Sequence, residues 1–218
     1  MQRVYGILFD NDGTLLDTHD LLVSSMRYAT QKVLGKDLPE EKLMAKVGQP
    51  LAAQMWDFTD DEAVHEELLA VYREYNHAHH DQEVSLFPGV KETLAMLKDE
   101  GFPMGVVTSK RHELAIHGLS LFGIEQYFDF LVGADDWETA KPHPGPVKHA
   151  CDMMDLSPRQ VMYVGDSPFD AQAANGAGCI SVAALWGMFD KERLEKEEPD
   201  YFAATFSELP LLVTRLNS

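Results

Sequence analysis

Two carboxylates, Asp10 and Asp12, stand two positions apart directly after an apolar run at residues 4–9. In nearly extended backbone, residues i and i+2 point to the same side, so both carboxylates can converge on one ligand. Gly13 follows them and lets a ligand approach the backbone closely. This pattern predicts a ligand site at the carboxyl end of a strand, where open α/β folds bind ligands. The competing interpretation is an acidic loop that caps a helix, because Asp and Gly are common in such loops.

Two further polar positions have the chemistry of anion binding. Thr108 follows the apolar run at residues 104–107, and its hydroxyl can donate a hydrogen bond to an anion. Lys141 stands in a loop whose neighbouring prolines, Pro142 and Pro144, stiffen the backbone and can hold an ammonium in place. Taken singly, Thr108 is typical of a helix cap and Lys141 of a solvated surface loop.

A second acidic pair, Asp166 and Asp170, follows the apolar run at residues 161–164. Magnesium prefers carboxylate oxygens together with water ligands, so this pair can complete a hard-cation site. Taken alone, the same residues could form an N-cap whose charges suit the helix dipole. All these polar groups fall at the carboxyl ends of predicted strands, which favours one shared site over several unrelated caps.

The elements that must position these residues alternate between short apolar runs and helical patterns. The runs are too short for helices and rich in Val and Ile, as buried strands are. Such alternation predicts right-handed βαβ units and a parallel sheet covered on both faces, a doubly wound α/β fold. The expected strands are residues 4–9, 104–107, 130–132, 161–164, 180–182 and 200–206, and the expected helices are residues 90–100, 113–122, 145–154, 170–177 and 207–216, the last with Ser207 as N-cap.

Residues 17–87 interrupt this alternation. They contain no convincing strand, whereas residues 19–34 and 60–81 have the pattern of long amphipathic helices and residues 39–46 that of shorter ones. A Pro-Gly pair at residues 88–89 marks the return to the alternating pattern. We interpret the segment as a helical domain inserted after the first strand. The alternative is a helical layer packed on the sheet itself.

The composition indicates a globular protein with a strongly acidic surface. The chain has 218 residues and a formal net charge of −18, from 18 Lys and Arg against 36 Asp and Glu. Such a surface repels nucleic-acid phosphates and anionic membranes, so we expect neither as a partner. The first residues do not resemble a signal peptide, and Cys151 and Cys179 are expected to be free buried thiols in a reducing cytosol. We therefore expect a cytoplasmic protein, and its oligomeric state stays open.

Four motifs occur in an order that resembles the phosphatase branch of the haloacid dehalogenase superfamily, namely Asp10-Asn11-Asp12, Thr108, Lys141 and Gly165–Asp170. The resemblance covers essentially the whole chain. It implies a doubly wound core at residues 1–16 and 88–218, with a helical cap at residues 17–87, in agreement with the interruption described above. It also implies a hydrolase that transfers phosphate through a covalent aspartyl-phosphate.

The same resemblance assigns chemical roles. Asp10 would be the nucleophile, and Asp12 would protonate the leaving oxygen and later deprotonate the hydrolytic water. Thr108 would hydrogen-bond the transferred phosphoryl group, and Lys141 would offset the negative charge of Asp10 and phosphate. The residues expected beside the same phosphate are Gly13, Ser109 and Lys110.

Mg²⁺ is the cofactor that the resemblance implies. Its ligands would be the Asp10 carboxylate, the backbone carbonyl of Asp12 and Asp166, with Asp170 as a further ligand or directly behind them. Clustered carboxylates repel one another without a cation, so the metal is expected to assemble the site as well as to take part in catalysis. Asp12 favours phosphoryl transfer, because dehalogenase relatives lack this second Asp. Thr14 favours hydrolysis, since sugar-phosphate mutase relatives often carry Val there.

Two stretches of the expected cap bear on the substrate. Residues 46–51 resemble the cap loop of phosphoglycolate-phosphatase-like proteins, in which Lys46 and Gly48 would lie near the substrate and Lys46 could meet a carboxylate as a point charge. Many relatives carry an arginine near this loop, and this chain does not. The departure weakens the case for glycolate recognition.

Residues 72–81 resemble the matching stretch of haloacid-dehalogenase-type inorganic pyrophosphatases, in which Arg73 or His77 could sense a phosphate. His77 and His80 share a helix face and could bind a metal; the plainer interpretation is a polar helix end suited to the helix dipole. The sequence therefore predicts a Mg²⁺-dependent phosphohydrolase for a small phosphorylated metabolite, with a phosphomonoester of the phosphoglycolate type placed first. An inorganic pyrophosphatase is the alternative. A protein that only senses a phosphorylated ligand is the more distant one.

Overall fold

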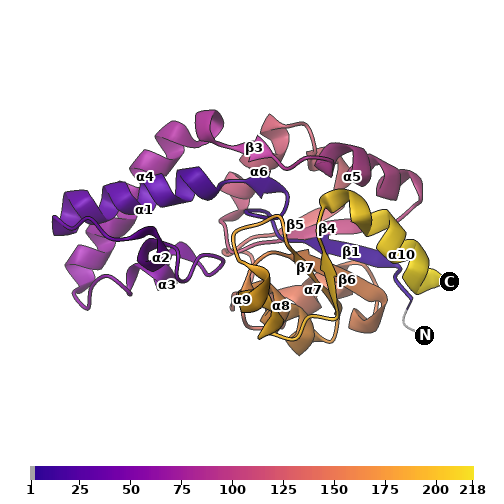
Figure 1. Cartoon of the computed structure of the whole chain (residues 1–218). Coiled ribbons are helices and arrows are strands. Elements are labelled where there is room, and N and C mark those ends of the chain that lie inside the picture. The colour runs from indigo at the N-terminus through magenta and orange to yellow at the C-terminus, as the bar shows by residue number, and fades with distance from the viewer. Residues whose placement is uncertain (1–2) are drawn as a thin grey trace.

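A six-stranded parallel sheet forms the centre of the protein (Figure 1). The computed structural model describes residues 3–218. The strand order is β5-β4-β1-β6-β7-β8, and every neighbouring pair is parallel. This order confirms the predicted doubly wound α/β fold, because the chain moves outward from β1 on both sides through crossovers. The strands are Gly6–Phe9 (β1), Met104–Val107 (β4), Phe130–Val132 (β5), Val161–Gly165 (β6), Ile180–Ala184 (β7) and Tyr201–Ala203 (β8).

Helices cover both faces of the sheet, and together with it they form the core. Successive residues of β1 point to opposite faces: Ile7 and Phe9 join one apolar cluster and Leu8 joins the other. Burial on both faces explains why these strands are continuous apolar runs in the sequence. The first cluster is closed by α5 (Val90–Asp99), α6 (His112–Leu121) and α10 (Leu209–Asn217), and the second by α7 (Gly145–Met153) and α8 (Pro168–Ala177) (Figure 1).

Residues 18–84 form a helical lobe beside the sheet, in which the two long helices α1 and α4 lie side by side (Figure 1). The lobe has an apolar cluster of its own, to which Met26, Met55 and Leu68 contribute from three different helices. A separate cluster is what an inserted domain needs in order to have its own core. The lobe consists of α1 (His19–Leu34), α2 (Glu40–Leu43), α3 (Leu51–Met55) and α4 (Glu62–Glu83).

A two-stranded antiparallel ribbon connects the lobe to the core. β2 (Leu16–Asp17) pairs with β3 (Ser85–Leu86), so that Leu16 lies opposite Leu86. The sequence pattern predicts no strand in this segment, because strands of two residues are too short to show a periodic pattern. The ribbon places the two chain crossings next to each other, so the lobe is attached at one narrow point.

The predicted bounds coincide with those of α1, β4 and β5, whereas the closing helix begins later than predicted. Ser207 lies in a 3-10 turn, Phe206–Glu208 (η3), and Glu208 is the N-cap of α10. Pro210 accounts for this start, because proline is favoured in the first turn of a helix, where its missing N–H needs no partner. The prediction of Ser207 as N-cap is therefore wrong.

Three short elements complete the chain, namely η1 (Glu125–Tyr127), η2 (Pro158–Gln160) and α9 (Lys191–Glu195). Cys151 and Cys179 are buried free thiols, as expected, with their sulfurs 3.6 Å apart. None of the helices within residues 3–218 combines the length and apolarity that crossing a bilayer requires.

Candidate active site

Asp10 is the first residue after β1, and it is only 3% exposed. Its backbone N–H donates to the carbonyl of Val164 at 2.9 Å, which extends the pairing of β1 with β6 by one residue. Its Oδ1 accepts from the backbone N–H of Asn11 at 2.7 Å and lies 2.8 Å from Nζ of Lys141. The predicted nucleophile is thus held in one position at the edge where the sheet ends.

Lys141 is buried, and its ammonium contacts two carboxylates. Nζ lies 2.8 Å from Asp10 Oδ1 and 2.5 Å from Asp170 Oδ1, and it donates to the hydroxyl of Tyr163 at 3.2 Å. Burial alone would lower the pKa of this amine, but Asp10 and Asp170 outweigh burial and raise the pKa, so Lys141 stays charged. Tyr163 also donates to Asp170 at 3.0 Å, which fixes the lysine and its partners relative to one another.

Asp166 follows β6 and packs against the Asp10–Asp12 loop. Its Oδ1 accepts from the Thr14 hydroxyl at 2.9 Å, and its Oδ2 accepts from the backbone N–H of Met188 at 2.8 Å. Gly13 has φ +82°, and a Cβ there would overlap the Asp166 carboxylate. Gly13 therefore lets the Asp166 carboxylate lie close to the backbone of this loop. Burial and the nearby Asp170 raise the pKa of Asp166 to about 7.

Three buried carboxylates gather at one point, and their chemistry fits a hard divalent cation. One oxygen each of Asp10, Asp166 and Asp170 lies within 4.8 Å of the other two. Burial and Asp170 raise the pKa of Asp10 well above its ordinary value, although Lys141 acts in the opposite direction. A cation would stabilise the ionised form of such carboxylates, and oxygen ligands are those that Mg²⁺ prefers.

Asp170 differs from the other two carboxylates because protein groups already occupy both of its oxygens. Oδ1 contacts Lys141 and Tyr163, and Oδ2 accepts from the backbone N–H of Ser167 at 3.0 Å and from its hydroxyl at 2.5 Å. Ser167 is the N-cap of α8 and forms a capping box with Asp170. This arrangement favours the predicted position behind the metal ligands and speaks against direct ligation by Asp170.

Asp12 forms an ion pair with a second lysine, Lys110, whereas Asp10 contacts Lys141. Lys110 Nζ donates to Asp12 Oδ1 at 2.8 Å, and the two side chains are 10% and 19% exposed. Burial would raise the pKa of Asp12, but the Lys110 ammonium outweighs burial and lowers it. The buried hydroxyl of Thr108, at the end of β4, accepts from the backbone N–H of Lys110 at 3.2 Å. The loop after β4 therefore brings the Lys110 ammonium to Asp12.

A loop of the lobe lies over this edge of the sheet. The Ser109 hydroxyl donates to the carbonyl of Gly48 at 2.7 Å, so Ser109 contacts the lobe. Gly48 has φ +99°, and a Cβ there would lie 2.7 Å from the Ser167 hydroxyl, so the loop backbone rests directly on the core. Lys46 lies outside this contact: its side chain is 44% exposed and forms an ion pair with Asp57.

A cavity of about 640 Å³ lies between the lobe and the carboxyl edge of the sheet. Its size suits a small phosphorylated molecule. Residues from both sides line it, including Asp10, Asp12, Thr108, Lys110, Asp166, Gly48, Tyr72, Arg73, Asn76 and His77. Lys46 is not part of the lining. His79 and His80 are turned elsewhere, towards the Tyr75 carbonyl and the Asp81 carboxylate.

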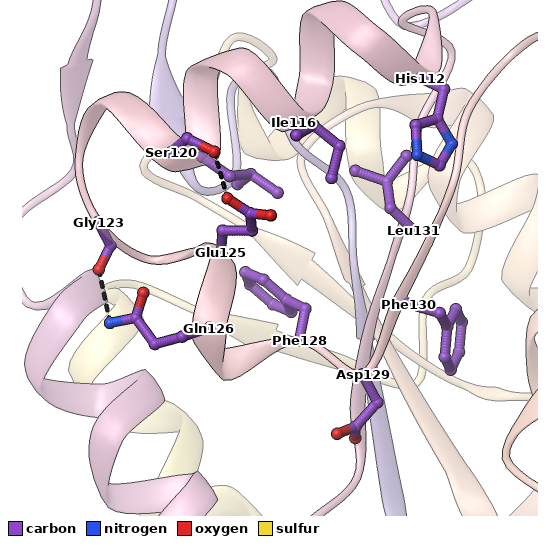
Figure 2. A pocket seen from close by; sticks show the side chains of 11 residues that line it. His112, Ile116, Ser120, Gly123, Glu125, Gln126, Phe128, Asp129, Phe130 and Leu131 are labelled. Carbon is purple, nitrogen blue, oxygen red and sulfur yellow. Dashed lines mark hydrogen bonds between the residues drawn. The ribbon is translucent and has the colours of Figure 1, made fainter.

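A second hollow, of about 690 Å³, lies between α6 and the edge strand β5 (Figure 2). Ser120 and Glu125 hydrogen-bond to each other on its wall, and Gln126 donates to the Gly123 carbonyl at 2.8 Å (Figure 2). Its lining contains none of the predicted catalytic residues. The predicted catalytic residues that follow β1 and β4 therefore line the first cavity and not this hollow.

Some residues of the site carry no signal in the sequence. Tyr163 is one more large residue in the buried strand β6, and its role is visible only from its contacts with Lys141 and Asp170. Met188 contributes a backbone N–H, which any residue type except proline would provide. Neither could be found from residue type and spacing.

Comparison with known proteins identifies the family. Residues 7–184 match the haloacid dehalogenase-like hydrolase family. The chain is 42% identical over 200 residues to a provisionally named pyrophosphatase PpaX of Caldanaerobacter subterraneus subsp. tengcongensis, covering 92% of this chain and 90% of that protein. It is 34% identical over 215 residues to pyrophosphatase PpaX of Bacillus mycoides, covering 99% of each.

Solved structures share the same architecture. A predicted phosphoglycolate phosphatase from Haemophilus somnus 129pt has a TM-score of 0.89 at 28% identity, covering 97% of this chain and 99% of that one. A predicted phosphatase from Clostridium acetobutylicum has a TM-score of 0.87 at 26% identity, with the same coverage of 97% and 99%. The resemblance seen in the sequence is confirmed: the chain belongs to the haloacid dehalogenase-like hydrolase family and is an enzyme of its phosphatase type.

Proposed function

We propose that this protein is a Mg²⁺-dependent phosphohydrolase that forms an aspartyl-phosphate on Asp10. The observation that supports this most directly is the buried contact of 2.8 Å between Asp10 and Lys141. A nucleophile must be ionised, and Lys141 favours the ionised carboxylate against the burial that raises its pKa. Mg²⁺, held by Asp10 and Asp166, would add positive charge where the phosphoryl oxygens gather.

In the first half-reaction, Asp10 attacks phosphorus with Oδ2, because Asn11 and Lys141 occupy Oδ1. A new bond forms between Oδ2 and phosphorus while the bond from phosphorus to the leaving oxygen breaks. Thr108 donates to a phosphoryl oxygen, and Asp12 gives its proton to the leaving group. In the second half, Asp12 takes a proton from water as that water attacks phosphorus, which releases phosphate and restores Asp10.

Lys110 couples substrate binding to the proton on Asp12. While Lys110 donates to Asp12 at 2.8 Å, the pKa of that carboxyl is lowered and the acid is ionised. A substrate phosphate competes for the same ammonium. When it draws Lys110 away, burial again dominates, the pKa of Asp12 rises, and Asp12 can carry the proton that the leaving group needs.

The cavity favours a second phosphate over a carboxylate as the remainder of the substrate. Arg73 and His77 stand one turn apart on α4 and line the cavity from the lobe, and Lys110 lines it from the core. Lys46, the group expected to meet a carboxylate, pairs with Asp57 instead. The relatives named pyrophosphatase agree with this charge pattern. Inorganic pyrophosphate is therefore the first candidate substrate, and a small phosphomonoester such as phosphoglycolate is the second.

Steady-state kinetics with Mg²⁺ and a panel of pyrophosphate, phosphoglycolate and an aryl phosphate tests this proposal. We expect kcat/KM for pyrophosphate to exceed that for phosphoglycolate by roughly tenfold or more, which about 1.4 kcal/mol of differential binding provides. Arg73→Ala should lower kcat/KM for pyrophosphate and change the aryl phosphate rate little. Lys46→Ala, which removes a lobe charge outside the cavity, is the matched control. Faster hydrolysis of phosphoglycolate would reverse the order of candidates, and no turnover of any phosphate would favour a ligand sensor.

A further inference from the structure

A second cluster of metal-ligating side chains lies outside the active site, where α4 of the lobe meets α6 of the core. Asp81 Oδ1 is 2.9 Å from Nδ1 of His80 and 2.7 Å from Nε2 of His117. One ligand atom of each residue lies within 4.8 Å of those of the other two. Two imidazoles from separate parts of the chain therefore converge on a single carboxylate oxygen.

The cluster is anchored on its inner side and open on its outer side. The His80 side chain is only 6% exposed, and its Nδ1 is held against the Asp81 carboxylate. The Asp81 and His117 side chains are 54% and 50% exposed, which leaves the outer side of the cluster open to water. His80 and Asp81 stand in the last turns of α4, where the helix dipole favours a cation.

We propose that His80, Asp81 and His117 form a binding site for a transition-metal dication of the Zn²⁺ type, completed by water. Two imidazole nitrogens and one carboxylate oxygen are a ligand set suited to Zn²⁺, whereas Mg²⁺ prefers oxygen ligands. In a tetrahedral site with bonds of about 2.0–2.1 Å, ligand atoms stand roughly 3.4 Å apart. The two rings therefore need to move outward from Asp81 by roughly half an ångström as the ion replaces their hydrogen bonds.

Because of its position, an ion at this site would restrain the motion of the lobe against the core. Gly118, the neighbour of His117, is packed at the base of the lobe: a Cβ there would lie 2.8 Å from Leu16 of the ribbon and 3.6 Å from Nε2 of His80. An ion bound by α4 and α6 ties the lobe to the core beside the ribbon that attaches it. Bound Zn²⁺ therefore slows opening of the lobe, and turnover falls where that opening limits product release.

Zn²⁺ titration of the Mg²⁺-saturated protein, followed by calorimetry, tests this site. His117→Ala removes a half-exposed ligand, and His112→Ala is the matched control. His112 stands on the same helix and pairs with one carboxylate, Asp136, at 2.5 Å, with a side chain 41% exposed. We expect one Zn²⁺ site in the wild type and in His112→Ala, and binding at least tenfold weaker in His117→Ala. Asp81→Asn, which keeps the shape of the side chain, should show the same loss.

Two further measurements complete the test. Co²⁺ in place of Zn²⁺ should give the visible absorption of a four-coordinate ion in the wild type and the control, and not in His117→Ala. With Mg²⁺ saturating, Zn²⁺ should slow hydrolysis of an aryl phosphate in the wild type, whereas His117→Ala keeps its basal rate and resists Zn²⁺. Equal Zn²⁺ affinity in both proteins, or no binding at all, would overturn the site. Inhibition that persists in His117→Ala would assign the ion to the Asp10–Asp166 carboxylates and contradict the proposal.

Discussion

Two lysines give the aspartates of the first motif different environments. Asp10 contacts Lys141, and burial together with Asp170 still raises its pKa. Asp12 contacts Lys110, which lowers the pKa of that carboxyl against the effect of burial. Environments that separate two pKa values suit carboxylates with different roles. A cation at Asp10, and a substrate phosphate that draws away Lys110, would both move these pKa values towards an ionised nucleophile and a protonated acid.

Substitutions of Asp10 and Asp12 should therefore impair catalysis in different ways. Asp10→Asn removes the nucleophile and should abolish turnover of every substrate. Asp12→Asn removes the proton donor, a loss of about 10²- to 10⁴-fold for an alkyl phosphate, and a much smaller loss in the first step for an aryl phosphate with an acidic phenol. The Asp12 variant should then accumulate phosphoenzyme, because dephosphorylation also needs Asp12 as a base.

Rapid acid quench with labelled substrate, followed by mass spectrometry of the Asp10 peptide, would detect this species. The mechanism is wrong if both variants lose activity equally for every leaving group and label never reaches Asp10.

Lys110→Met tests the coupling of that lysine to the proton on Asp12. Without the ammonium, burial alone acts on Asp12, so its pKa should rise and the proton donor should persist to higher pH. We expect the alkaline limb of the kcat/KM profile for an alkyl phosphate, which reports the free enzyme, to move upward in pH, and KM to rise because a phosphate contact is lost. Lys46→Met, on the lobe surface, is the control. An unchanged alkaline limb would mean that Lys110 does not set the protonation of Asp12.

At the scale of elements, the ribbon and the Gly48 loop both join the lobe to the core. The ribbon attaches the lobe through paired strands, and the loop rests on Ser109 and Ser167. We expect the lobe to move as a unit about the ribbon, so that the loop contact forms in the closed state and breaks on opening. This contact would exclude water from the aspartyl-phosphate.

Gly48→Ala should open this contact. Its φ is +99°, and the added methyl would lie 2.7 Å from the Ser167 hydroxyl, so both strain and overlap act against closure. Gly35→Ala is a matched control, because Gly35 has φ +63° and nothing within 4 Å of an added Cβ. Both variants should lose a similar free energy of unfolding, about 1–2 kcal/mol, because alanine is strained in left-handed backbone. Only Gly48→Ala should lower kcat/KM, and it should raise hydrogen exchange in residues 46–50. Equal kinetics in the two variants would refute loop closure.

At the scale of the whole molecule, the clustered carboxylates link folding stability to pH and metal. The raised pKa of Asp166, about 7, means that the folded protein binds this proton more tightly than the unfolded chain does. In metal-free buffer this contribution is therefore fully present below the ordinary value of 3.8 and is lost as pH rises to about 7. Mg²⁺ binds the ionised form and should restore stability.

We expect the rise in Tm on adding Mg²⁺ to be small near pH 5 and to grow up to about pH 8, as the Asp166 carboxyl ionises. Asp166→Asn should flatten this dependence and weaken Mg²⁺ binding. Asp20→Asn, at an exposed acid of the lobe, should leave both unchanged. Scanning calorimetry with EDTA or Mg²⁺ measures the difference, and a Mg²⁺ effect that is constant with pH would exclude Asp166 as a ligand.

The sequence by itself determined the strand-end chemistry and the doubly wound fold. Short apolar runs followed by Asp10, Thr108 or Asp166 place polar groups at one edge of the sheet, because parallel strands share that edge. It also separated the helical segment from the alternating pattern, although the ribbon of β2 and β3 was too short to predict. These features follow from the spacing of apolar residues within short stretches of the chain, which can be read directly from the sequence.

Only the tertiary structure decided which of these groups meet. Ser109 bonds Gly48 across 61 positions of the chain, Lys110 bonds Asp12 across 98, and His117 meets Asp81 across 36. The first and third pairs depend on how closely the lobe lies against the core, and the second depends on how two loops of the core pack together. No periodic pattern encodes either arrangement. The sequence could therefore supply a lysine beside the phosphate, whereas the packing of the loops after β1 and β4 turned Lys110 towards Asp12. Burial makes an unpaired charge costly, so the lysine pairs with the carboxylate within reach.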